Sequence, residues 1–245
     1  MRVGIMQPYF LPYMGYFQLI SAVDKFIIYD NIKYTKKGWI NRNRWLVRGS
    51  DVLFTLPLRK GSDTLQVNER EISDDFNRIK FLNQLTENYR QAPHFDETYS
   101  LIEKLLPFED RNLFRVIYNS ALLICRHLHI TTEVIVSSSI NTGHDLKGRD
   151  RVIALCKAVD SKIYINPTGG AALYSAHDFH VNGLILNFIR SRDLSYKQFE
   201  NHHTPNLSIV DVLMFNPVWR VKELLNEYDL IGGNDPITVD VEGMF

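Results

Sequence analysis

The chain has 245 residues, of which 45% are hydrophobic and 23% charged, a composition typical of an ordered globular protein. Lysine plus arginine and aspartate plus glutamate both number 28, and a formal charge of zero excludes a general attraction to nucleic acid or anionic membranes. No apolar run has the length of a signal peptide or a membrane span. Cys125 and Cys156 show no disulfide or zinc spacing. We therefore expect a cytoplasmic protein with buried thiols and no membrane span.

The first 31 residues predict a strand, a loop, a helix and a second strand. Residues 2–6 form a short apolar run that ends before Gln7-Pro8, residues 16–23 place apolar side chains on one helical face, and residues 26–29 are again apolar. A crossover this short usually joins parallel strands. Asp30 follows the second strand.

The rest of the chain continues the alternation around a helical middle. Strands are expected at 52–58, 133–137, 162–165 and 184–189, and helices at 149–159, 171–175, 207–215 and 218–228. Residues 73–130 read as a helical insertion. The predicted architecture is one α/β domain over 1–245, with a Rossmann-like parallel-sheet core from 1–58 and 131–189. Residues 230–245 are expected to be a poorly ordered tail.

Polar and aromatic residues follow the first strand, at the sheet edge where open parallel sheets bind ligands. Gln7, Tyr9, Tyr13 and Tyr16 are the candidates. The alternative is that the aromatic rings fill the core between helix and sheet, although four polar tips would then all need partners.

The same loop carries a resemblance to a known family. The segments at 7–20, 24–30, 37–43 and 207–213 (QPYFLPYMGYFQLI, DKFIIYD, KGWINRN and LSIVDVL) closely resemble the WbqC-like family. The resemblance spans most of residues 1–215. It implies a role in surface polysaccharide assembly, with amino-acid (glycine) transfer onto a sugar as one suggested activity, and it supplies no established catalytic residue.

A more distant resemblance concerns the same strand, loop and helix. The layout is similar to the strand, His-x-Gly-His, helix of nucleotidylyltransferases (the HUP class), with Tyr13 and Tyr16 at the histidine places. This implies a nucleotide whose phosphates lie near a helix N-terminus. Tyrosine donates a hydrogen bond but carries no positive charge near pH 7, so nucleotide binding is implied more strongly than adenylyl transfer.

Two later segments and one carboxylate complete the predicted site. Lys37, Trp39, Asn41 and Arg42 belong to a basic-aromatic cluster suited to an anion and a ring, or to a solvated edge strand. A second loop follows the strand at 162–165 and is suited to an anion or to a simple turn; its candidates are Asn166, Thr168, Gly169 and Tyr174. Asp30 is the candidate general base, or a turn residue.

These residues predict a transferase that attaches an aminoacyl or acyl group to a nucleotide-linked amino sugar. Asp30, Tyr13 and Tyr16 are its catalytic candidates. The predicted substrate-binding residues are Gln7, Lys37, Trp39, Asn41, Arg42, Asn166, Thr168, Gly169 and Tyr174. Charged tRNA or another acyl donor is a candidate partner, a nucleotide the candidate cofactor, and no metal is expected because the histidines and cysteines lack ligand spacing. The alternatives are a non-catalytic sugar-nucleotide binding module and an ATP-using nucleotidylyltransferase-like enzyme. The oligomeric state is left open.

Overall fold

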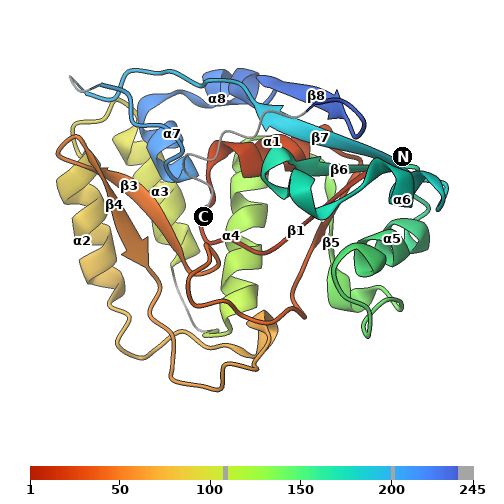
Figure 1. Cartoon of the computed structure of the whole chain (residues 1–245). Coiled ribbons are helices and arrows are strands. Elements are labelled where there is room, and N and C mark those ends of the chain that lie inside the picture. The colour runs from red at the N-terminus through yellow and green to blue at the C-terminus, as the bar shows by residue number, and fades with distance from the viewer. Residues whose placement is uncertain (107–109, 200–201, 237–245) are drawn as a thin grey trace.

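The centre of the protein is a six-stranded, mostly parallel sheet (Figure 1). The computed structural model describes residues 1–106, 110–199 and 202–236. The strand order is β5-β2-β1-β6-β7-β8; the first five are parallel, and β8 is antiparallel to β7. These strands are β1 Arg2–Met6, β2 Lys25–Ile28, β5 Glu133–Val136, β6 Ile163–Pro167, β7 Ile185–Ser191 and β8 Tyr228–Gly232. The expected α/β class and parallel sheet are confirmed.

Helices cover both faces of this sheet because successive strand residues point to opposite sides. In β1, Val3 and Ile5 enter one core with α5 and α6, whereas a side chain at Gly4 would meet Leu19 of α1. The larger core, on the α1 face, also contains side chains of α4, α7 and α8. These helices are α1 Met14–Ala22, α4 Leu113–His127, α5 Gly148–Ala158, α6 Ala176–His180, α7 Ile209–Phe215 and α8 Val218–Leu224.

A separate two-stranded hairpin stands beside the sheet, next to α2 (Figure 1). Its strands, β3 Arg42–Val47 and β4 Ser50–Thr55, are antiparallel. The turn residues Arg48 and Gly49 have φ angles of 51° and 82°, as a two-residue hairpin turn with the twist of the strands requires. The expectation that residues 33–58 join the parallel core is therefore wrong. The hairpin lies outside the parallel sheet, and its residues Asn43 and Arg44 lie at the carboxyl ends of β1 and β6.

The region expected to be a helical insertion contains α2 Arg78–Tyr89, α3 Phe95–Leu105 and α4. Three other expectations need correction. The predicted helix at 171–175 is a 3-10 helix over Thr168–Leu173, and the helix predicted over 218–228 ends at Leu224. Residues 230–232 lie in β8 rather than in a tail, because pairing with β7 satisfies their backbone groups. The remainder of the expected tail, 237–245, lies outside the described residues.

No helix within the described ranges is long and apolar enough to cross a membrane.

Candidate functional site

A cavity of about 260 Å³ lies at the carboxyl ends of β1 and β6. At β1 the strand order changes direction, since β2 lies on one side and β6 on the other, and open α/β sheets bind ligands at such a point. The lining combines aromatic rings, amides and one cation: Ile5, Met6, Gln7, Tyr9, Tyr13, Tyr29, Trp39, Asn43, Arg44, Asn166, Pro167, Gly169, Gly170, Leu173, Tyr174 and Asn206.

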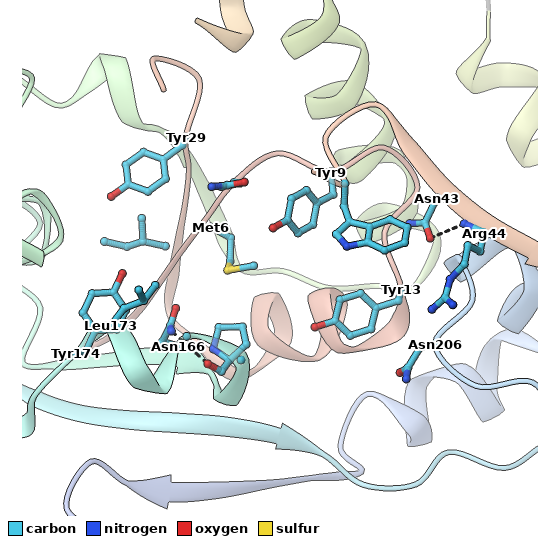
Figure 2. A pocket seen from close by; sticks show the side chains of 16 residues that line it. Met6, Tyr9, Tyr13, Tyr29, Asn43, Arg44, Asn166, Leu173, Tyr174 and Asn206 are labelled. Carbon is cyan, nitrogen blue, oxygen red and sulfur yellow. Dashed lines mark hydrogen bonds between the residues drawn. The ribbon is translucent and has the colours of Figure 1, made fainter. Parts of the chain in front are cut away.

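The cavity has two walls of different origin (Figure 2). Tyr29, Asn166 and Tyr174 lie on one side, contributed by the ends of β2 and β6 and by the 3-10 helix that follows. Tyr13 and Arg44 lie on the other, contributed by the loop before α1 and by the hairpin. A ring of a ligand that lies between these walls would therefore have aromatic side chains on both sides.

The tyrosines of the cavity are neutral hydroxyl donors near pH 7. Burial raises the pKa of Tyr9 to about 12. Burial is also the main cause that raises the pKa of Tyr13 and of Tyr29 above the usual tyrosine range. In Figure 2 the hydroxyl groups of Tyr9 and Tyr13 point toward the middle of the cavity. They can donate hydrogen bonds to a ligand, but they are not bases at physiological pH.

Arg44 is the cation of the lining, and the hairpin fixes its position. Its guanidinium lies 5.5 Å from the centre of the Trp39 ring and donates a 2.9 Å hydrogen bond to Asp51. Its Nε is buried and has no hydrogen-bond partner among the described residues. The adjacent Asn43 accepts from the Arg44 amide at 2.8 Å and donates to the carbonyl of Leu11 at 2.9 Å. These bonds tie β3 to the loop that carries Tyr13.

The glycines after β6 allow a close packing that shapes the opposite wall. A Cβ on Gly170 would lie 2.1 Å from the amide nitrogen of Asn166, which is closer than any real contact. Asn166 is itself held by the Tyr164 hydroxyl, which donates to its side-chain oxygen at 3.0 Å. Gly170 therefore leaves room for the Asn166 amide at the cavity wall.

The structure brings six of the predicted site residues together and leaves six elsewhere. Those that line the cavity are Gln7, Tyr13, Trp39, Asn166, Gly169 and Tyr174. Those that do not are Tyr16, Asp30, Lys37, Asn41, Arg42 and Thr168. The expectation of one cleft lined by all of them therefore needs correction, and the reasons differ from residue to residue.

Tyr16 and Asp30 are buried away from the cavity. Tyr16 is 1% exposed, and its hydroxyl donates to the backbone carbonyl of Gln7. Asp30 is 4% exposed and accepts hydrogen bonds from the Ser137 hydroxyl, the Ser138 amide and the Asn68 amide group. Burial alone would raise the pKa of Asp30, but these hydrogen bonds outweigh it and lower the pKa. The Asp30 carboxylate joins the end of β2 to the chain at Asn68 and at Ser137–Ser138. Asp30 therefore has the environment expected of a turn residue.

Three residues of the basic-aromatic cluster support the loop instead of lining the cavity. The Arg42 guanidinium donates to the carbonyls of Gly38 and Lys37, so it closes its own turn. Lys37 is exposed. Asn41 is buried, donating to the carbonyl of Leu56 at 2.7 Å and accepting from Tyr34. Arg44, two residues further along the same strand, is the arginine that lines the cavity.

Thr168 lines a second cavity of about 170 Å³ that adjoins the first. The two cavities share Tyr13, Pro167 and Asn206.

Sequence reasoning missed several residues of the main cavity. Arg44 lies two residues after Arg42, so both side chains point to the same face of a strand. A predicted hairpin would therefore have made Arg44 a candidate as well. Asn206 comes from a loop far along the chain and carries no local signal. No group of three or more histidine, cysteine, aspartate or glutamate side chains in the described part of the chain could hold a metal ion.

Comparison with known proteins assigns the family. The model of the WbqC-like protein family matches residues 7–223. The chain belongs to the WbqC-like family. It is also 29% identical over 221 residues to Rv1507c of Mycobacterium tuberculosis, an uncharacterized protein, and this match covers 88% of the present chain and 93% of that protein. No solved structure matches the chain.

Proposed function

We propose that this WbqC-like protein is a cytoplasmic transferase of surface polysaccharide biosynthesis, which binds a nucleotide-linked amino sugar in the main cavity. The observation that carries the proposal is the cavity's position at the point where the strand order changes direction, together with its aromatic and amide lining. The order β5-β2-β1-β6-β7 corresponds to the 3-2-1-4-5 order of Rossmann folds, which supports a Rossmann-like assignment. The two free, buried cysteines fit a reducing compartment.

The proposed reaction transfers an acyl or aminoacyl group to the amine of the sugar. The amine nitrogen forms the new bond to the acyl carbon, the bond to the donor's leaving group breaks with its electron pair, and the leaving group takes up the proton that the amine loses. Of the three catalytic candidates, Tyr13 lines the cavity, so its hydroxyl is our candidate for contacting the reacting amine or carbonyl. Arg44 also lines the cavity, and its guanidinium is our candidate donor of charge-assisted hydrogen bonds to oxygen atoms of the substrate's ring.

A binding module without catalysis is the second candidate function. The observation that favours it is that the cavity lining holds no histidine or carboxylate, and that its tyrosines are not basic near pH 7. The nucleotidylyltransferase-like alternative, which would use ATP, predicts release of pyrophosphate instead of an acylated product.

One experiment separates these three functions. The protein is incubated with UDP- and dTDP-linked amino sugars and, in separate reactions, with ATP plus glycine, glycyl-tRNA or acyl-CoA, and the products are analysed by mass spectrometry. The proposal predicts a mass increase on the amino sugar that requires both donor and protein. Binding of the sugar nucleotide without turnover in any reaction would favour the module. Pyrophosphate release from ATP without an acylated sugar, together with a nucleotidylated product, would favour the third function.

A matched pair of variants tests the site itself. If Arg44 donates to an oxygen of the substrate's ring, Arg44→Met weakens binding of the sugar nucleotide about ten- to a hundred-fold, since a charge-assisted hydrogen bond contributes roughly 1.5–3 kcal/mol. Arg48→Met is the control, because Arg48 is an exposed arginine of the same hairpin and lies outside the cavity. Equal affinity of the two variants, measured by calorimetry, would contradict the assignment of Arg44.

A further inference from the structure

The second cavity adjoins the first and differs from it in chemistry. It lies between the start of α1, the end of β7 and the loop at 203–207. Tyr13, Pro167 and Asn206 belong to both linings, so one ligand can extend from one cavity into the other. Its lining includes two arginines, Arg190 and Arg192, where the first cavity has one.

Thr168 presents an unused hydrogen-bonding group to this cavity. The residue is 8% exposed and lines the cavity. Its hydroxyl has no hydrogen-bond partner among the described residues. The hydroxyl oxygen is nevertheless not completely sealed from the cavities or solvent. Because buried polar groups are normally hydrogen-bonded, a ligand or water in this cavity would supply the partner that the Thr168 hydroxyl lacks.

The first turn of α1 forms another part of the lining, through Met14 and Gly15. The helix has no side-chain cap at Tyr13 and no acidic residue in its first turn, so its positive end is not neutralised by its own chain. A Cβ on Gly15 would lie 2.4 Å from the Tyr13 ring and 2.8 Å from the hydroxyl oxygen of Ser191. The missing side chain lets these two side chains pack against the first turn of the helix.

The two arginines of this cavity differ in the ion pairs that they form. Arg192 is held by both Asp229 and Glu227, at 2.9 and 3.3 Å. Arg190 has a single, longer contact of 3.5 Å to Asp229. The side chain of Arg190 is 43% exposed, so it can turn to a ligand at little cost. Asp193 also lines the cavity but is exposed to solvent, which screens its charge.

We propose that the second cavity is a phosphoryl subsite, in which the Thr168 hydroxyl, the start of α1 and Arg190 bind the diphosphate of a ligand whose ring lies in the first cavity. The proposal rests on the proposed function for the identity of that ligand. The subsite itself requires only an oxyanion that accepts hydrogen bonds from these groups. A phosphoryl group has several acceptor oxygens and can satisfy all three at once.

The test measures binding of inorganic pyrophosphate in magnesium-free buffer by isothermal titration calorimetry. We expect wild-type protein to bind it, and Thr168→Val to weaken binding about ten- to a hundredfold because a hydrogen bond to an ionised oxygen is lost. Arg190→Met should weaken binding further and flatten its dependence on salt. Thr64→Val is the matched control, since Thr64 lies in the exposed loop at 60–64 away from both cavities, and we expect no change.

The outcomes separate this proposal from the proposed function. No pyrophosphate binding by the wild type, or equal affinity of Thr168→Val and wild type, would overturn the subsite. If a sugar nucleotide binds but is insensitive to Thr168→Val, the proposed function stands and the subsite is wrong. If pyrophosphate binding depends on Thr168 while no sugar nucleotide binds, the subsite stands and the proposed function is wrong.

Discussion

The Tyr89 hydroxyl joins α2, β3 and α7 through hydrogen bonds, and we predict that its removal destabilises the protein. Tyr89, in α2, donates to the carboxylate of Asp211 in α7 at 2.8 Å and accepts from the Leu46 amide of β3 at 2.7 Å. Tyr89 and Asp211 are both 0% exposed. Tyr196 and Gln198 donate to the other oxygen of Asp211. Strand β3 also carries Arg44, so this network helps to hold the hairpin wall of the cavity.

The Tyr89→Phe substitution removes two hydrogen bonds and adds no strain. The Leu46 amide is left buried without a partner, which costs roughly 1–3 kcal/mol, and a hydrogen bond to a buried carboxylate is lost, worth roughly 1.5–3 kcal/mol. Because the two losses share one hydroxyl they are not additive, so we expect a decrease of about 2–4 kcal/mol in the free energy of unfolding.

The pH dependence of this decrease has a defined sign. Burial raises the pKa of Asp211, and the hydrogen bonds from Tyr196, Tyr89 and Gln198 oppose that effect. Removing the Tyr89 donor therefore raises the pKa further. Since a raised pKa lowers stability as the pH rises above the usual aspartate value of about 4, the deficit of the variant should grow from acidic to neutral pH.

Urea unfolding followed by circular dichroism at pH 7 and pH 4 measures both effects. Tyr118→Phe is the control, because Tyr118 stacks on Phe114 and its hydroxyl makes no hydrogen bond to the described residues; its expected change is below about 0.5 kcal/mol. A change below about 1 kcal/mol in Tyr89→Phe, or a deficit that shrinks toward neutral pH, would refute the assigned network.

Three further predictions concern Asp30, Gly170 and the two buried thiols. The hydrogen bonds that lower the pKa of Asp30 should make Asp30→Asn less stable than wild type at pH 7, with a difference that disappears as the pH falls below about 4; a pH-independent difference in urea unfolding would contradict this. Gly170→Ala should cost about 1–3 kcal/mol because the new methyl group displaces the Asn166 amide, so an unchanged unfolding midpoint would disprove the close packing. Burial raises the pKa of Cys125 and Cys156 to about 12, so Ellman's reagent should label neither thiol before unfolding, and rapid labelling of the native protein would be the contrary result.

The parallel core was predictable because its signals are local. The strands at 2–6 and 26–29 are apolar runs bounded by proline and aspartate, and the helix between them has a clear periodicity. The hairpin was not predicted as a separate sheet because pairing of β3 with β4 depends on the Arg48-Gly49 turn, and arginine is an unusual residue at positive φ. Strand β8 was missed because antiparallel pairing with β7 is a long-range contact.

The site was predictable to the extent that its residues follow a predicted strand. Gln7 comes directly after β1, Asn166 lies at the end of β6, and both line the cavity. Asp30 also follows a strand, but Ser137 and Asn68 approach it from distant parts of the chain and occupy its carboxylate. Arg42 was chosen over Arg44 because composition alone does not show which arginine turns back to its own loop.

A crystal structure of the protein with a bound UDP-linked amino sugar is the sharpest test of ligand binding in the main cavity. We predict density for the sugar or base ring between the Tyr29 and Tyr13 walls of this cavity, with the diphosphate directed toward Thr168 and the start of α1. A ligand bound at another surface, with this cavity containing only solvent, would contradict this prediction.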